Sequence, residues 1–193
     1  MVSSRVIYFC FLGLLACERA LELALSRRNA RLAFSRGAVE AGHRHFRAMA
    51  TFHTLFFFSC VAEVLVLQRP FPGLIGVAAY LGAIGAQGLR YWTIFTLKER
   101  WNVRVIVFPN AVPVTSGPFR FMRHPNYLAV VLEMFCVPLA HGAWITALVF
   151  SLANAALLAV RIRVEESALG SQYAAAFADR PRLLPRFRRG TSH

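Results

Sequence analysis

Charged residues are scarce in this chain, and this scarcity limits the class of protein to which it can belong. Asp, Glu, Lys and Arg make up 16% of the 193 residues, whereas hydrophobic residues make up 57%. Soluble globular domains typically carry about a quarter charged residues and at most about half apolar ones. The composition therefore argues against an ordinary soluble domain and indicates a membrane protein.

Acidic residues are the rarest charged class, with nine Asp and Glu against 22 Lys and Arg, which gives a net charge of +13. Such an excess is common in nucleic-acid-binding proteins. Here, however, the basic residues lie in short blocks between apolar runs, and the chain contains no recognised nucleic-acid motif. We therefore expect no nucleic-acid partner.

The chain also lacks the residue patterns that hold metals. Its four cysteines lie inside apolar runs without C-x-x-C spacing, so we predict neither a zinc site nor a disulfide framework. His43 and His45 have a spacing that could bind a metal, but no carboxylate or cysteine accompanies them in the local run. We predict interfacial histidines there and no metal site. The cysteines are Cys10, Cys17, Cys60 and Cys136.

Long apolar runs, by contrast, fill the chain and predict membrane-spanning helices. Five segments are apolar, and in lipid they must be helical because backbone polar groups have to be satisfied within the segment. The first is similar to a signal-peptide core, but its apolar spacing continues beyond a cleavage-like site, so we predict a retained span. The segments are residues 6–25, 46–67, 73–97, 127–140 and 144–160, the last continuing as a helix to about Tyr173.

These lengths predict the domain organisation. Four segments are long enough for a hydrocarbon core of roughly 30 Å, and the short fourth forms a helical hairpin with the fifth. We predict an all-α integral-membrane protein of about five spans, forming one domain over residues 1–193. Residues 1–97 hold three spans, and residues 98–193 hold a connector, the hairpin and the C-terminal part.

The basic residues predict the topology of this domain. Of the 22, six lie in residues 26–47, five in residues 98–123 and seven from Arg161 to the end, all on one side of a five-span arrangement. The positive-inside rule makes that side cytoplasmic. We therefore expect the N-terminus outside and the C-terminus in the cytoplasm.

The densest polar stretch is VTSGPFRFMRHPNYL, residues 114–128. Gly117 and Pro118 make a turn, and Pro125 suits the first turn of a helix because its missing N–H costs nothing there. His124 would then stand at the N-cap, where basic neighbours and the helix dipole favour an anion. We interpret the stretch as the floor of a ligand pocket at a membrane surface. The alternative is a simple helix start whose arginines meet lipid phosphates.

A second polar cluster follows the last span. Arg161 and Glu165 are four residues apart and share one helix face, and Glu166 adds a second carboxylate. Ionisable groups so close to a membrane are costly and are often functional. The alternative is a juxtamembrane ion pair on a solvated helix.

Together, GPFR-x-x-RHPNY, a short hairpin and R-x-x-x-EE resemble the isoprenylcysteine carboxyl methyltransferase family, integral-membrane enzymes related to phospholipid methyltransferases. The likeness covers roughly residues 91–173. The chain is most similar to a bacterial branch that O-methylates long-chain alkylpyrones or alkylresorcinols. It departs from the family at Ala129, where many members have glycine, and in the tail after the paired glutamates. The features similar to that branch are Trp101, Asn102, Arg104, Val105, Glu133 and Asn154.

This resemblance implies S-adenosylmethionine as methyl donor, in a cytoplasm-facing pocket formed by the C-terminal half. It implies that Arg161 faces the substrate oxygen and is oriented by Glu165, although the two glutamates could exchange roles. The implied cofactor-binding residues are Gly117, Pro118, Arg120, Arg123, His124, Tyr127 and Glu166.

Methyl transfer requires few dedicated catalytic side chains. Displacement at a sulfonium depends mainly on positioning two bound partners. A carboxylate acceptor needs only a guanidinium to orient it, and an enol or phenol profits from a cation that favours its anion. Arg161 suits either acceptor, so we assign no general base.

The acceptor itself is expected to be a lipophilic molecule from the bilayer. An alkylpyrone or alkylresorcinol polyketide and an isoprenylcysteine carboxylate both remain open. The arginine- and alanine-rich composition looks bacterial, which favours the polyketide and an inner-membrane location. The alternatives are N-methylation of a phospholipid head group and a non-enzymatic scaffold with a basic inner face.

Charges and glycines within the spans complete the predictions. We expect the buried charges to pair across the bundle, because unpaired charges in a membrane are costly. Glu133 is expected to join them or to line the substrate tunnel. Three glycines at positions 82, 85 and 88 predict close helix packing. The charges expected to pair are Glu18, Arg19, Glu63 and Arg90.

Overall fold

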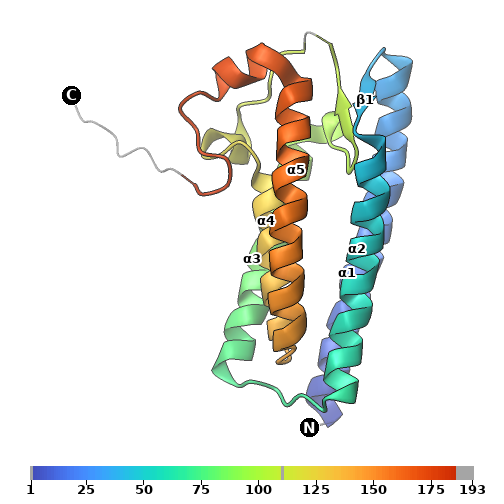
Figure 1. Cartoon of the computed structure of the whole chain (residues 1–193), viewed down its shortest axis with the longest axis vertical. Coiled ribbons are helices and arrows are strands. Elements are labelled where there is room, and N and C mark those ends of the chain that lie inside the picture. Colours follow the sequence, from blue (N-terminus) through green and yellow to red (C-terminus); the bar gives the residue numbers. More distant parts are fainter. Residues whose placement is uncertain (1, 110, 186–193) are drawn as a thin grey trace, which may run out of the picture.

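A computed structural model describes residues 2–109 and 111–185, without the side chains of residues 2 and 43–45. Five helices run up and down its long axis, and Figure 1 shows the N-terminus at one end and the connector and tail at the other. The prediction of an all-α fold is confirmed for the bundle. The helices are α1 (Val2–Ser35), α2 (His43–Val66), α3 (Leu74–Leu97), α4 (Pro125–Leu139) and α5 (Trp144–Ala176).

Shorter elements join the helices at the connector end. Two 3-10 turns, η1 (Lys98–Arg100) and η2 (Gly117–Arg120), precede α4. Strand β1 (Val39–Ala41) pairs antiparallel with β2 (Val105–Val107), with Glu40 opposite Ile106. The sequence analysis did not predict this pair, which ties the α1–α2 turn to the connector.

The main hydrophobic core lies in the half of the bundle away from the connector. Helix α4 packs against α3 on one side and α5 on the other, and α2 also packs against α5. Tyr8, Phe56, Ala83, Met134 and Ala147 come from five different helices and are all almost fully buried in this core. The opposite half holds two smaller apolar clusters together with the polar residues described below.

The first helix is longer than predicted. The segment 26–35, expected to be part of a loop, continues α1 to Ser35. Ser26 and Asn29 are buried on one face of it, where Ser26 Oγ donates to Asn102 Oδ1 (2.7 Å) and Asn29 Nδ2 donates to the Trp101 carbonyl (2.8 Å). These bonds hold the helix against the connector, so the basic segment is ordered rather than a free loop.

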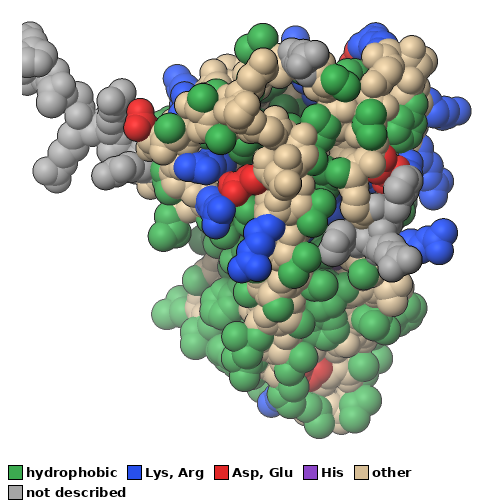
Figure 2. Space-filling model, turned by 45° about the horizontal axis from the view of Figure 1, so that its top comes forward, with side chains coloured by type: hydrophobic (Ala, Val, Ile, Leu, Met, Phe, Trp, Pro, Cys, Tyr) green, Lys and Arg blue, Asp and Glu red, His purple; other side chains and the backbone are tan. Residues whose placement is uncertain are grey.

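Apolar side chains dominate the outer surface of the bundle. Within the part of the chain that the structure describes, two helical stretches are long and apolar enough to cross a membrane, Phe46–Val66 and Trp144–Ala176, and Pro125–Leu139 is apolar but shorter. Figure 2 shows hydrophobic side chains over the lower part of the molecule and most Lys and Arg side chains above them. The surface is thus divided into an apolar zone and a basic end.

The C-terminal segment folds back onto the connector. Helix α5 continues past Val160 as predicted, with one non-helical residue at Gly170 (φ 75°). Beyond it, the Arg123 and His124 N–H groups donate to the carbonyls of Pro181 (2.9 Å) and Arg182 (3.0 Å). The tail therefore packs beside the start of α4.

Candidate functional site

The first group of polar residues, here called the His124 cluster, consists of Arg123, His124, Glu166 and Arg182. His124 is 4% exposed and directly precedes Pro125, the first residue of α4. Its Nε2 lies 3.1 Å from Glu166 Oε1, and Arg182 donates to Glu166 Oε2 (2.7 Å). Arg123 approaches the same carboxylate at 3.7 Å. The connector, α5 and the tail thus converge on Glu166.

Charge is unevenly distributed in the His124 cluster. One carboxylate faces two guanidiniums, and the hydrogen bond to Glu166 raises the pKa of Arg182 above its ordinary value. Because guanidiniums stay charged in proteins, the cluster carries two positive charges against its single carboxylate. A ligand that presents both a carboxylate and an amino group would find a counter-charge for each.

Aromatic rings lie next to this cluster. The His124 ring stacks on Tyr127, with centroids 5.2 Å apart and an interplanar angle of 21°, and the Tyr173 ring centroid lies 6.2 Å from that of His124. Tyr173 in turn contacts Phe177 at 4.6 Å. Flat side chains in this arrangement can hold a planar ring by stacking.

The second group, the Arg161 cluster, consists of Tyr127, Arg161 and Glu165. Arg161 is 7% exposed, and its Nε donates to the Tyr127 hydroxyl oxygen (2.9 Å). The Tyr127 O–H donates to Glu165, and Arg161 also donates to the Val103 carbonyl. The predicted link between Arg161 and Glu165 is thus made through Tyr127, which belongs to both clusters.

A cavity of about 740 Å³ opens beside the Arg161 cluster. Its wall is formed by all five helices and the connector, and most of it is apolar, including Phe9, Leu12 and Phe57. Arg161 and Tyr127 line it as well. A long apolar molecule could therefore lie in the cavity with one polar end at Arg161.

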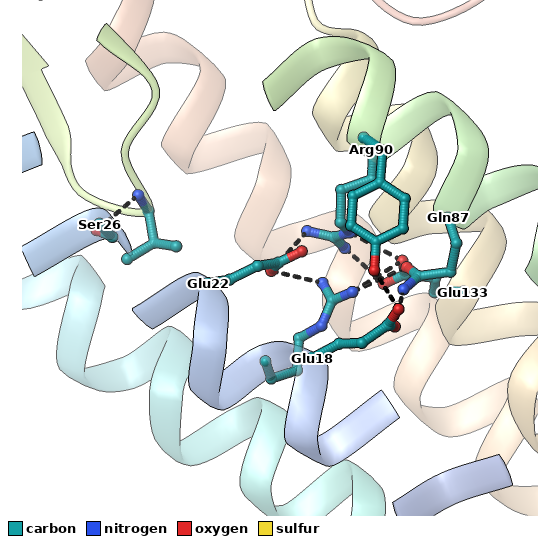
Figure 3. A network of polar contacts seen from close by, with 9 residues as sticks. Glu18, Glu22, Ser26, Gln87, Arg90 and Glu133 are labelled. Carbon is teal, nitrogen blue, oxygen red and sulfur yellow. Dashed lines mark hydrogen bonds and ion pairs between the residues drawn. The ribbon is translucent and has the colours of Figure 1, made fainter. Parts of the chain in front are cut away.

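Farther along the same bundle lies a charge network of Glu18, Arg19, Glu22, Arg90 and Glu133 (Figure 3). Arg90 donates to both Glu133 oxygens (2.9 and 2.5 Å), and Arg19 lies 3.0 Å from Glu22. The predicted pairing of Arg19 and Arg90 across the bundle, with Glu133 joining them, is confirmed.

Glu63 was expected in this network, but its contacts are elsewhere. It pairs with Arg69 (2.9 Å) and accepts hydrogen bonds from the Thr146 N–H (2.7 Å) and hydroxyl (2.8 Å). Thr146 lies in the first turn of α5, where free N–H groups need acceptors. Glu63 therefore anchors the start of that helix.

The predicted cofactor loop is closely packed on α3. Gly117 has φ +57°, and a Cβ there would lie 2.4 Å from Thr96 Oγ1, which explains the glycine. Pro118 is buried, whereas Arg120 is exposed and stacks over Phe121 at 5.0 Å. The described contacts place Arg120 outside both clusters.

Three further predictions concern metals and glycines. The side chains of His43 and His45 lie outside the described residues, and within the described part no three His, Cys, Asp or Glu residues are grouped as metal ligands.

The prediction of close helix packing is confirmed at Gly82, where a Cβ would lie 2.7 Å from Cys136 Sγ. It is wrong at Gly85 and Gly88, where a Cβ would meet open space.

Sequence reasoning missed some residues that the structure brings to the site. Arg182 reaches Glu166 from a tail whose composition gave no signal for a contact. Glu22 and His53 line the cavity with Asn126. The i,i+3 spacing of Arg19 and Glu22 could have indicated an ion pair in the first span. No pattern around His53 distinguished it within its apolar run.

Comparisons with known proteins relate the chain to one family and to proteins of two bacteria. A model of the isoprenylcysteine carboxyl methyltransferase (ICMT) family matches residues 77–171, which include both clusters except the tail. The chain is 39% identical over 163 residues to the Uncharacterized protein YpbQ of Bacillus subtilis, covering 84% of this chain and 96% of that one. It is 30% identical over 172 residues to an Uncharacterized protein of Haemophilus influenzae, covering 88% and 96%.

Proposed function

The chain belongs to the isoprenylcysteine carboxyl methyltransferase family, and from this premise we propose that it transfers a methyl group from S-adenosylmethionine to an oxygen of a lipophilic acceptor. Membership makes the protein a membrane methyltransferase. The observation that carries the finer proposal is the position of Tyr127. It stacks on His124 of one cluster and bonds to Arg161 of the other, at the wall of the apolar cavity.

The His124 cluster has the chemistry to hold S-adenosylmethionine. Glu166 can accept from an amino group or ribose hydroxyls, and Arg123 and Arg182 offer counter-charges for a carboxylate. His124 and Tyr173 offer aromatic faces for a purine. The bound cofactor would supply a methyl group on a sulfonium, whose S–CH3 bond breaks as the acceptor's O–CH3 bond forms.

The Arg161 cluster would orient the acceptor. The buried guanidinium favours an oxygen that is anionic or becomes so, and it disfavours the amine of a phospholipid head group. This is our reason for proposing O-methylation over N-methylation. The acceptor is an alkylpyrone, an alkylresorcinol or an isoprenylcysteine carboxylate, since each combines an apolar chain with an acidic oxygen.

We also infer the setting of this reaction. The five helices would cross the inner membrane of a bacterium, with the basic end and the cofactor pocket facing the cytoplasm. A cofactor from the cytosol would then reach the His124 cluster, and an acceptor from the bilayer would enter the cavity. The division of the surface in Figure 2 supports this orientation.

The test is cofactor binding by calorimetry on the detergent-purified full chain. We expect wild type to bind S-adenosylmethionine at micromolar Kd, and Glu166→Gln and His124→Ala to weaken binding at least about tenfold, because each loses a charge-assisted contact. Glu99→Gln is the matched control, since Glu99 also pairs with an arginine (Arg36, 2.7 Å) but is exposed and outside the site.

Binding by wild type and the control, together with loss in both site variants, supports the proposal. Absence of binding by well-folded wild type overturns it in favour of a scaffold with a basic face. Equal binding by all four proteins would place the cofactor away from the His124 cluster.

A further inference from the structure

We propose that the acceptor cavity contains a second polar subsite, centred on Glu22, that binds a hydrogen-bond donor on the acceptor apart from its reacting oxygen. The subsite consists of Glu22 on α1 and His53 on α2, with Arg19 and Arg90 behind Glu22. All four line the same cavity as Arg161. The inference rests on the proposed function in taking this cavity as the acceptor's binding place.

Glu22 is buried and only half satisfied. It is 7% exposed, and its Oε2 lies 3.0 Å from Arg19 and 3.7 Å from Arg90. Its other oxygen, Oε1, is buried without a hydrogen-bond partner among the described residues. A carboxylate oxygen left bare in an apolar wall is costly, and a donor from a ligand would offset that cost.

His53 adds a second acceptor to the same wall. Its Nδ1 lies 2.8 Å from the Met49 carbonyl, and a carbonyl can only accept. The proton of a neutral ring is therefore on Nδ1, which leaves Nε2 able to accept. Both groups consequently favour a ligand that donates.

The net charge of the surrounding network also favours a neutral donor over an anion. With all groups ionised, the three carboxylates of Glu18, Glu22 and Glu133 exceed the two guanidiniums by one negative charge. An anionic group would be repelled here, whereas a hydroxyl would be accepted. The acid function of the acceptor thus belongs at Arg161, and a neutral hydroxyl belongs at Glu22.

The spacing of the two polar positions suits one molecule. On α4, Tyr127 of the Arg161 cluster and Glu133 of the charge network are six residues apart, and a helix rises about 1.5 Å per residue, so the two levels are separated by roughly 9 Å. Arg161 and Tyr127 line the cavity near the first level, and Glu22 and Arg90 of the charge network line it as well. An amphiphile with two polar groups on its head, such as a dihydroxylated ring, can contact both.

A corollary concerns the number of methyl groups transferred. A ring with two hydroxyls that has been methylated once carries one ether, and an ether cannot donate to Glu22. The monomethyl product would therefore bind poorly in the orientation needed for a second transfer. The subsite predicts that methylation stops after one step.

The test measures acceptor binding to the full chain without cofactor, by calorimetry in detergent micelles. The probes are an alkylresorcinol, its monomethyl ether and the alkylphenol of equal chain length. We expect wild type to bind the alkylresorcinol about tenfold more tightly than either other probe, as one hydrogen bond to a charged group provides.

The variant Glu22→Gln sharpens this test. Its amide oxygen must face the arginines, because guanidiniums only donate, so its NH2 group is left for the ligand. We expect the tenfold preference to disappear or to turn towards the monomethyl ether. The matched control is Glu18→Gln, which removes the same charge from the same network. Glu18 bonds to Gln87 and Tyr91 and does not line the cavity, so we expect the preference to remain.

Equal binding of the three probes by wild type overturns the inference, whether or not the variants fold. So does an equal loss of preference in Glu18→Gln and Glu22→Gln, which would mark an effect of the whole network. A failure of the proposed function is distinct. It would appear as absent S-adenosylmethionine binding while the acceptor preference in wild type persists.

Discussion

The hydroxyl of Tyr127 connects the two charged residues of the Arg161 cluster, because it accepts from Arg161 and donates to Glu165. Tyr127→Phe removes that connection while keeping the ring that stacks on His124. We expect kcat/KM for methyl transfer to fall roughly ten- to hundredfold, as for a buried hydrogen bond to charged groups, while the Kd for the cofactor changes by less than about threefold. Steady-state kinetics and calorimetry measure the two quantities.

A second tyrosine provides the control for this prediction. The Tyr91 O–H also donates to a glutamate, Glu18, but this pair lies outside the cavity. Tyr91→Phe should therefore leave kcat/KM within about threefold of wild type, since a partly exposed bond contributes little. Equal losses in both variants would contradict a specific role for the Tyr127 hydroxyl.

At the scale of elements, α4 packs along α3, and a glycine allows their close approach at one position. A methyl group at Gly82 would meet Cys136 Sγ at 2.7 Å, whereas Gly85, one turn farther along α3, faces open space. We expect Gly82→Ala to destabilise the protein by about 1–3 kcal/mol through overpacking. We expect Gly85→Ala to be neutral or stabilising by up to about 1 kcal/mol, because alanine favours the helix.

Thermal unfolding of the two variants in the same detergent measures this difference. A lower Tm for Gly82→Ala beside an unchanged or higher Tm for Gly85→Ala is the expected result. Equal shifts would mean that Cys136 moves away at no cost and that α3 does not depend on the glycine at position 82.

The helices and their order could be predicted because each apolar run has to form its own backbone hydrogen bonds. The end of α1 could not, because Ser26 and Asn29 are held by Asn102 and Trp101, more than seventy residues away in the chain. Polar residues in a basic segment look like a loop until such partners are known. The strand pair could not be predicted either, because a strand of three residues is too short to show a periodic pattern.

Within the candidate site, the two motifs predicted a shared site for His124, Tyr127, Arg161 and both glutamates. The structure brings these five together through contacts such as His124 to Glu166 and Arg161 to Tyr127. Local spacing could not predict Arg182, because its approach depends on how the tail turns after Gly170. Contacts made by irregular segments depend on tertiary packing and are not encoded in any periodicity.

For the whole molecule, the distribution of charge and the placement of the site have one cause. The connector, the end of α5 and the tail all lie at the end of the bundle opposite the N-terminus (Figure 1). Together with the end of α1 and the start of α2, the described parts of these segments hold most of the Lys and Arg residues, which makes that end basic. Under the proposed function, the groups that would bind the cofactor carboxylate would therefore also set the orientation of the protein in a membrane.

This orientation is the last prediction, and reporter fusions in a bacterial host test it. Five passes place the residue 68–73 turn and the C-terminus on opposite sides of the membrane. We expect alkaline phosphatase, which is active only outside the cytoplasm, to be active when inserted at that turn and inactive when fused to the C-terminus. Green fluorescent protein, which fluoresces in the cytoplasm, should give the reverse pattern. Phosphatase activity at both positions would contradict five passes, and activity at the C-terminus alone would place the basic end outside, where the cytosolic cofactor could not reach Glu166.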